Sequence, residues 1–192
     1  MTQKKKRPLP VYLNDAERNR LTGTVASQGS LRDLTLIHTM LQYGLRASEV
    51  LMLQVEDVNL DARRVAVTRL KNGIDNELPL IRPLLPIMRR YLEQLPPHQD
   101  ILFTGQRGAL TRNSLWRMMQ RYGKAAKLPR RKRHPHVLRH TAAVHALDAG
   151  LDIMDVKDLL GHVNVANTTI YAQVSDKKRR AAFRVLEAAN GH

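Results

Sequence analysis

The residues best suited to chemistry lie between positions 136 and 171. His136, Arg139 and His140 fall within five residues, His162 follows a Leu-Gly pair, and Tyr171 comes nine residues later. Cleaving a phosphodiester without a metal needs cations on the non-bridging oxygens, a nucleophile and a proton donor for the leaving oxygen. Arginine matches phosphate oxygens, histidine exchanges protons near neutral pH, and a tyrosine hydroxyl becomes a nucleophile when cations surround it. This segment therefore contains the residue types that phosphoryl transfer requires.

A metal centre is the main alternative for His136 and His140, because histidines four residues apart share one face of a helix. The zinc-protease pattern needs a glutamate after the first histidine, where this chain has Val137. Arg139 lies between the two histidines and would repel a cation, and no carboxylate stands nearby as a third ligand. We therefore expect neither a metal nor another cofactor.

The charge balance indicates a polyanionic partner, either nucleic acid or an acidic membrane surface. The 192 residues include 32 Lys and Arg against 17 Asp and Glu, a net charge of +15, and no cysteine. Residues 101–147 hold 11 Lys and Arg and no acidic residue, which indicates a phosphate-facing surface. The lack of cysteine excludes disulfide scaffolds and thiolate zinc sites. No apolar run approaches the ~18 residues that span a bilayer, so we expect a cytoplasmic protein without membrane contact.

Helical periodicity and capping residues predict the elements that position these residues. Asn14 with Glu17 three residues later forms a capping-box pattern, and Ser30 caps a second helix, which Gly44 interrupts before a short third helix. The apolar stripe of the second helix consists of Leu31, Leu34, Ile37 or His38, Leu41 and Leu45. Further helices are expected over residues 83–95, 111–127, 135–149, 152–160 and 175–189, with a basic linker at 129–135.

Between the third and fourth helices the apolar period changes to that of β-strands. Asn72-Gly73 is a turn pair, and apolar residues alternate on both sides of it, which predicts an antiparallel hairpin. The alternating residues are Val65, Val67, Leu78 and Leu80, and residues 58–60 add a third strand. The predicted fold class is therefore mostly α with a small antiparallel β-sheet (α+β).

Taken in order, these motifs resemble those of the tyrosine recombinases, also called phage integrases. The resemblance runs from about residue 10 to residue 185. Its pieces are Gly44-Leu45-Arg46-Ala47-Ser48-Glu49, Lys71 on the hairpin, His136-Val137-Leu138-Arg139-His140, Leu160-Gly161-His162 and Tyr171. It implies the tyrosine recombinase catalytic-domain fold.

The resemblance also implies a site-specific DNA recombinase that cleaves and rejoins DNA through a 3′-phosphotyrosyl intermediate, without metal or ATP. Arg46 and Arg139 would grip the scissile phosphate, His162 would donate a hydrogen bond to it, and Tyr171 would attack it. Two alternatives share these residues: a DNA-binding regulator that has lost strand exchange, and a type IB topoisomerase. Whether recombination results in inversion, integration or resolution stays open.

Other residues take further roles by the same resemblance. Lys71 would protonate the departing 5′ oxygen, although Arg69 is a nearby competitor for that role. His136 would accept or shuttle the tyrosine proton, while His140 gives support from the same helix. Glu49 would orient the arginines.

Several of these residues also fit ordinary structural positions. Arg46 and Glu49 match a helix pair three residues apart, and His162 follows a helix-capping glycine. Tyr171 fits a core aromatic, although the polar residues before it argue otherwise. The single tryptophan, Trp116, lies among apolar residues and is expected in the core.

The expected organisation is a basic arm at residues 1–10, a catalytic domain at 11–175 and a C-terminal helix at 176–192. That helix either passes to a neighbouring protomer or packs on its own domain. Either the sequence is a fragment of a longer protein, or it has no separate N-terminal core-binding domain, as in the short recombinases that invert fimbrial promoters, which it resembles. We expect the second.

The expected partner is double-stranded DNA. By the resemblance, a homotetramer would hold two DNA sites and associate weakly without DNA, with accessory DNA-bending proteins. The residues expected to contact the DNA are Arg130, Arg131, Lys132 and Arg133, with Lys4, Lys5 and Lys6 of the arm.

Overall fold

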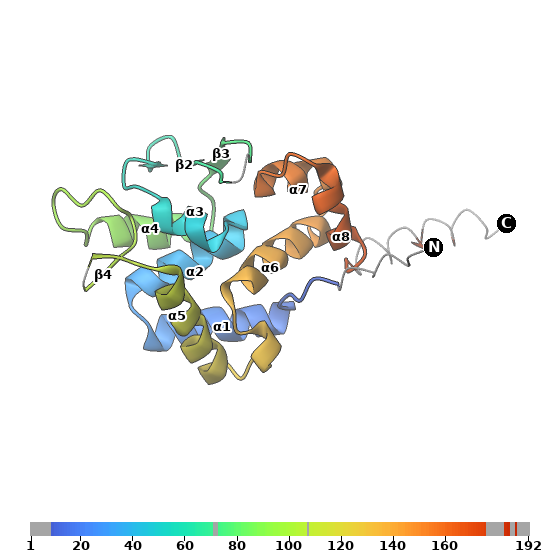
Figure 1. The fold of residues 1–192 in the computed structure, drawn as a ribbon, viewed down its shortest axis with the longest axis horizontal. Helices are drawn as coiled ribbons and strands as arrows, with labels where there is room; N and C mark the ends of the chain where they lie inside the picture. The colour runs from blue at the N-terminus through green and yellow to red at the C-terminus, as the bar shows by residue number, and fades with distance from the viewer. Residues whose placement is uncertain (1–8, 71–72, 107, 176–182, 185–186, 188–192) are drawn as a thin grey trace, which may run out of the picture.

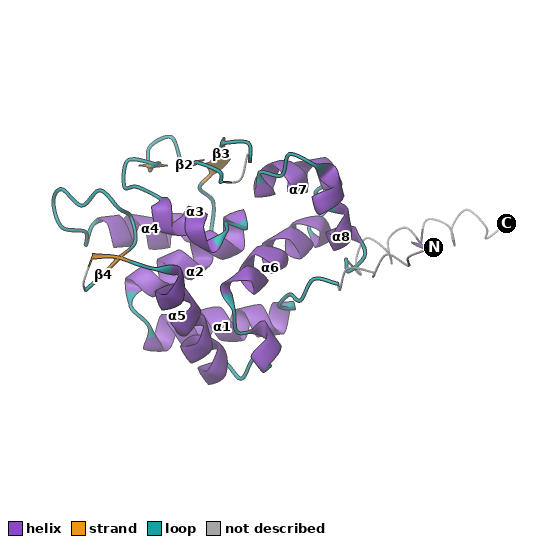
Figure 2. Cartoon of the chain, viewed as in Figure 1, coloured by secondary structure: helices purple, strands orange, loops and turns teal. Residues whose placement is uncertain are grey.

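The computed structural model describes residues 9–70, 73–106, 108–175, 183–184 and 187 (Figure 1). These residues form helices with two small antiparallel sheets, which confirms the predicted fold class (Figure 2). The helices are α1 (Asp15–Gln28), α2 (Leu31–Tyr43), α3 (Ala47–Met52), α4 (Leu84–Leu92), α5 (Arg112–Ala125), α6 (Pro135–Asp148), α7 (Ile153–Leu160) and α8 (Thr169–Ala172), with 3-10 helices η1 (Arg130–Lys132) and η2 (Val165–Asn167). The strands are β1 (Val58–Asn59), β2 (Arg64–Val67), β3 (Asn76–Pro79), β4 (Thr104–Gly105) and β5 (Gly108–Ala109).

The first helices begin and end where the sequence predicts. The Asn14 side chain accepts the Glu17 N–H and the Glu17 carboxylate accepts the Asn14 N–H, so α1 begins with a complete capping box. Ser30 caps α2 through its side chain. α2 ends at Gly44, whose φ of +58° lies in the left-handed region that favours glycine. This ending turns the chain so that Arg46 stands at the start of α3.

β1, β2 and β3 form one antiparallel sheet in that order, as expected. Val65 and Val67 of β2 are buried, which agrees with the predicted alternation. Val67 pairs with Asn76, so residues 68–75 join β2 to β3. This connection is longer than the two-residue turn that an Asn-Gly pair is typical of. The small β4–β5 pair was not predicted.

Two apolar clusters fill the described part of the chain. The larger one packs α1 to α5 with the β1–β3 sheet, and the smaller one gathers α6 and α7 residues around Tyr171. α6 packs against α2, and also against α7 and α8 (Figure 1). This central position brings the histidine-rich segment of α6 next to the start of α3. None of the helices in the described ranges is long and apolar enough to cross a bilayer.

The core position predicted for Trp116 is wrong. Its side chain is 49% exposed, because Leu115 and Met119 on α5 face the core and an adjacent helical residue points about 100° away. The stripe predicted on α2 is also shifted. Ile37 of that stripe and its neighbour Leu36 are fully buried, whereas the leucines of the stripe that lie within α2 are half-buried.

Candidate active site

A buried carboxylate organises the start of α3. Glu49 is 2% exposed, and its oxygens accept the Arg46 N–H at 2.8 Å, the Arg46 Nη1 group, and Arg69 Nη1 at 3.2 Å. Arg139 Nη1 lies 3.8 Å from the same carboxylate. Burial raises the pKa of Glu49, but the Arg46 hydrogen bonds and the charges of Arg46 and Arg69 outweigh it and lower the pKa. One carboxylate therefore holds three arginines, and the orienting role expected of Glu49 extends to Arg69.

Arg139 is the largest fully buried side chain of the described residues. Its Nη1 donates to the Gly44 carbonyl at 2.5 Å, and its Nη2 donates to the Leu160 carbonyl at 3.1 Å and to His162 Nε2 at 2.8 Å. Burial and the Arg46 charge lower the pKa of Arg139 to about 10, so the guanidinium stays charged at neutral pH. These bonds fix it between the end of α2 and the end of α7.

His162 follows Gly161, which ends α7 with a φ of +63°. Arg139 can only donate, so His162 Nε2 accepts, and the ring proton lies on Nδ1, which donates to Thr168 Oγ1 at 2.8 Å. Burial and the nearby Arg139 charge lower the pKa of His162 to about 4, which keeps the ring neutral. In this arrangement His162 offers no proton from Nε2, in contrast to the phosphate-donor role expected from the sequence.

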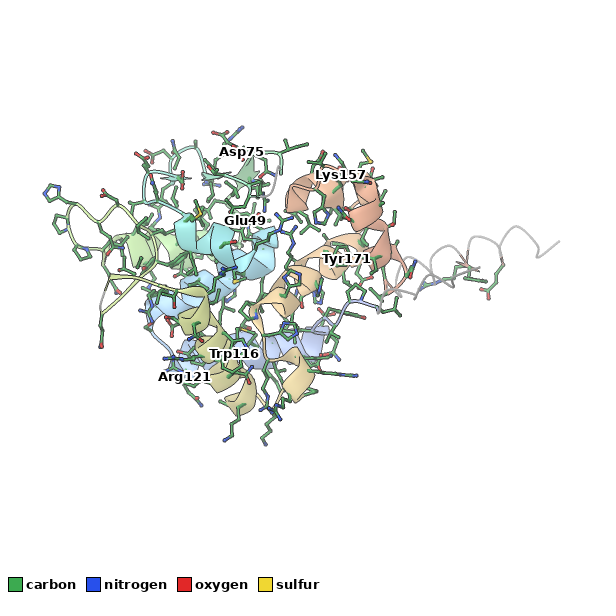
Figure 3. All side chains as sticks on the ribbon, in the orientation of Figure 1. Glu49, Asp75, Trp116, Arg121, Lys157 and Tyr171 are labelled. Carbon is green, nitrogen blue, oxygen red and sulfur yellow. The ribbon has the colours of Figure 1, made fainter. Side chains whose placement is uncertain are left out.

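Tyr171 lies on α8 with 3% of its surface exposed (Figure 3). Its hydroxyl lies 3.0 Å from His140 Nδ1. Burial raises the pKa of Tyr171, although the Arg139 and Arg46 charges act in the opposite direction. Burial and the neighbouring His136 lower the pKa of His140 to about 4, so the ring is neutral. The arginines alone therefore do not ionise this tyrosine.

His136 is exposed one turn away from His140, with the two ring centroids 4.7 Å apart and edge to face. The contact with the Tyr171 hydroxyl is made by His140, whereas the sequence assigned the tyrosine proton to His136 and a supporting role to His140. Within the described ranges no group of at least three His, Asp or Glu residues is placed to hold a metal ion.

Predicted residues from the start of α3, from α6, from the turn after α7 and from α8 meet in one cleft of about 430 Å³. Its lining includes Arg46, Arg139, His140, His162 and Tyr171. His136 and the segment 9–11 also line it. The cleft is therefore cationic at its floor and presents the tyrosine hydroxyl beside a neutral histidine, an arrangement suited to an attack on a phosphate.

The basic segment before α6 divides into two kinds of residue. Arg130 and Arg131 are exposed. Lys132 Nζ donates to Glu17, and Arg133 Nε donates to the Leu128 carbonyl. Both of these cations are thus paired within the protein, and the DNA contact of the four residues stays a prediction.

Two contacts that support the site were not predicted. Arg69 is buried against Glu49, and Thr168 fixes the ring of His162. Arg69 continues the alternation of Val65 and Val67, so the strand period places it on the buried face, and this signal was available in the sequence. No sequence signal marked Thr168. Lys71 and the arm lysines Lys4, Lys5 and Lys6 lie outside the described residues.

Comparison with known proteins identifies the family of this chain. The sequence model of the phage integrase family matches residues 12–178. The chain belongs to the phage integrase family. It is 33% identical over 186 residues to the tyrosine recombinase XerA of Pyrococcus furiosus, covering 95% of this chain and 63% of that protein. It is 30% identical over 191 residues to XerD of Staphylococcus epidermidis, covering 95% of this chain and 64% of that one.

Solved structures of recombinases and of a phage integrase share the fold. The crystal structure of XerA recombinase matches with a TM-score of 0.78 and 28% identity, covering 98% of this chain and 66% of that chain. XerH recombinase bound to its difH substrate matches with a TM-score of 0.75 and 25% identity, covering 90% and 52%. The catalytic domain of bacteriophage HP1 integrase matches at 0.67 with 22% identity, covering 95% and 99%. This family member thus spans just under two thirds of the curated relatives that it matches.

Proposed function

We propose that this chain carries the DNA-cleaving and DNA-rejoining centre of a site-specific recombinase, with Tyr171 as the nucleophile. The observation that carries the proposal is the single cleft in which the Tyr171 hydroxyl meets His140 while Arg46 and Arg139 line the same cavity. Fixed cations beside a nucleophile fit the charge of a phosphodiester transition state. The net charge of +15 and the tyrosine recombinases among the relatives support double-stranded DNA as the substrate.

The attack forms a bond from the Tyr171 oxygen to phosphorus and breaks the bond from phosphorus to the 5′ oxygen. The hydroxyl proton passes to His140 Nδ1, which already lies 3.0 Å away. Without DNA the raised pKa of Tyr171 and the low pKa of His140 keep the nucleophile protonated. A phosphate anion held in the cleft favours the imidazolium form of His140 and so assists the transfer.

Phosphate binding changes the partners of His162. A phosphate oxygen competes with His162 Nε2 for the Arg139 Nη2 donor. The same anion raises the pKa of the released ring, because a nearby negative charge favours the protonated form. His162 then carries a proton on Nε2 and donates it as a hydrogen bond to the phosphate. The donor role expected from the sequence is thus reached only after DNA enters.

The 5′ oxygen takes up a proton as it leaves, and Lys71 is the residue that we assign to this step. Strand exchange is the reverse reaction, in which the 5′-hydroxyl of a partner strand attacks the 3′-phosphotyrosyl bond. The bond energy is kept in that linkage, so the reaction needs no ATP. Exchanging both strands of two duplexes takes four attacking tyrosines, which supports four protomers on two DNA sites as the assembled form.

The test uses nicked suicide duplexes of randomised sequence, in which cleavage releases a short fragment and traps the covalent complex. The unaltered chain should form a complex that survives denaturing electrophoresis, and Tyr171→Phe should abolish it. Tyr91→Phe is the matched control, because Tyr91 is another buried tyrosine whose hydroxyl donates to the Leu102 carbonyl far from the cleft. DNA binding without any adduct would instead support a regulator that has lost exchange.

A further inference from the structure

Arg69 is a buried cation close to the cleft that does not line it. It follows β2, and its side chain has no exposed surface, so it cannot touch a DNA phosphate. Burial lowers its pKa, and the Glu49 charge acts in the opposite direction. A buried guanidinium is costly unless its donors are paired, so its partners indicate what the protein gains from it.

The guanidinium joins three separate elements. Nη1 donates to Glu49 of α3 at 3.2 Å, Nη2 donates to the Leu159 carbonyl of α7 at 2.5 Å, and Nε donates to Asn76 Oδ1 of β3 at 3.3 Å. The Arg69 N–H also donates to Asp75 Oδ1 at 2.6 Å, which closes the base of the β2–β3 connection. One side chain therefore ties the sheet to both sides of the catalytic cleft.

Three side chains donate hydrogen bonds to consecutive carbonyls in the C-terminal turn of α7. The last carbonyls of a helix lack intrahelical partners and carry the negative end of the dipole. Asn76 Nδ2 donates to the Asp158 carbonyl at 2.7 Å, Arg69 donates to that of Leu159, and Arg139 donates to that of Leu160. Successive carbonyls thus connect β3, the Arg69 side chain and the phosphate-binding arginine.

The packing beside this turn leaves little room for movement. A Cβ on Gly161 would come within 2.7–2.8 Å of the Arg69 Nε, Cδ and Cγ atoms. Gly161 directly precedes His162, so the stem of Arg69 sets how close the turn that carries His162 lies to the sheet. The same side chain contacts Glu49, which holds Arg46.

We propose that Arg69 is a positioning residue that fixes the separation between Glu49 and the C-terminal turn of α7, and thereby places Arg46, Arg139 and His162 around the scissile phosphate. This inference rests on the proposed function. It differs from the role of a competitor for Lys71, because Arg69 acts through the phosphate-binding residues and protonates no leaving group.

The test compares Arg69→Met and Arg69→Lys with the control Arg64→Met. Arg64 lies on β2, the strand that Arg69 follows, but its side chain is 60% exposed and pairs with the equally exposed Glu77. Arg69→Lys keeps the charge but cannot make all three guanidinium hydrogen bonds to α3, α7 and β3. It is the second variant if Arg69→Met does not fold. Circular dichroism and urea titration identify conditions in which each variant is folded.

Single-turnover cleavage is then measured on a suicide duplex that the unaltered chain cleaves, in three chemical forms. The first has the normal phosphodiester. The second has a methylphosphonate at the scissile position, which removes a negative charge and reduces the need for arginine. The third has a 5′-bridging phosphorothiolate, whose thiolate leaves without a proton donor.

Cleavage of the phosphodiester by folded Arg69 variants should be slower by roughly 10- to 10²-fold, the size of effect that a ~1 Å misplacement produces. This defect should shrink on the methylphosphonate and persist on the phosphorothiolate. Rescue by the phosphorothiolate alone would place Arg69 in leaving-group protonation and overturn the inference, as would a rate within about twofold of Arg64→Met. Absence of an adduct with the unaltered chain would instead refute the proposed function.

Discussion

Replacing Glu49 by glutamine tests the buried carboxylate at the centre of the arginine cluster. The Glu49 side chain has no exposed surface and accepts hydrogen bonds from Arg46 and Arg69. Glutamine keeps the shape, but it removes the charge and turns one acceptor into an NH₂ group that faces guanidinium donors. Removing one partner of a buried ion pair costs about 3–5 kcal/mol. Against a typical total of about 5–15 kcal/mol, Glu49→Gln should sharply lower the free energy of unfolding.

The assay is urea unfolding followed by circular dichroism at pH 7. With a urea m value of about 2 kcal/mol/M, the loss corresponds to a midpoint lower by about 1.5–2.5 M. Glu77→Gln is the control, because Glu77 forms a pair that is 60% exposed on both sides and should change stability by at most about 0.5 kcal/mol. A midpoint for Glu49→Gln equal to that of the control would refute the reasoning.

The pH dependence of the Glu49 contribution has a defined sign. Its folded pKa lies below the ordinary value of 4.5, so the unfolded chain binds the proton more readily. The stabilisation is therefore complete above pH 4.5 and is lost as the pH falls through the folded pKa. The unaltered chain and Glu49→Gln should differ by a constant amount near neutrality and converge only in acid.

Three further outcomes are expected. Replacing Arg130 and Arg131 by alanine should weaken DNA binding and flatten its salt dependence. Lys132→Met should mainly lower the urea midpoint, because Lys132 pairs with Glu17. Equal effects of the two changes on the salt slope would contradict this division. The single-turnover cleavage rate at subsaturating DNA should fall as the pH drops towards 4, because His140, with a pKa of about 4, then cannot accept the tyrosine proton; a flat profile for the folded protein would exclude it as the base. Gly161→Ala should lower the free energy of unfolding by at least about 1–2 kcal/mol, because of left-handed backbone strain alone. Urea unfolding measures this, and an unchanged midpoint would contradict the tight packing of Gly161 on Arg69.

Local signals account for the elements that the sequence predicted. Asn14 and Glu17 fix the start of α1 through bonds between side chains and backbone N–H groups, and Gly44 ends α2 through its φ. Both effects depend on neighbouring residues alone. The alternation of Val65 and Val67 identifies β2 for the same reason. Motif order then led to Tyr171 and its partners, because the family pattern carries spatial information that the spacing alone does not.

Tertiary packing decided what the sequence did not predict. Trp116 is an exception, because the buried stripe of α5 follows the helical period and already leaves this residue outside the core. Lys132 is paired because Glu17, 115 positions away, faces it. The choice of His140 over His136 for the Tyr171 hydroxyl likewise depends on how α8 docks on α6.

The identity of the residue that becomes linked to DNA tests the central claim most directly. The covalent complex formed on a suicide duplex is digested with protease and nuclease, and the nucleotide-bearing peptide is sequenced by mass spectrometry. The account predicts a 3′-phosphate ester on Tyr171 and on no other residue. A linkage on another side chain, or a 5′-phosphate linkage, would contradict it.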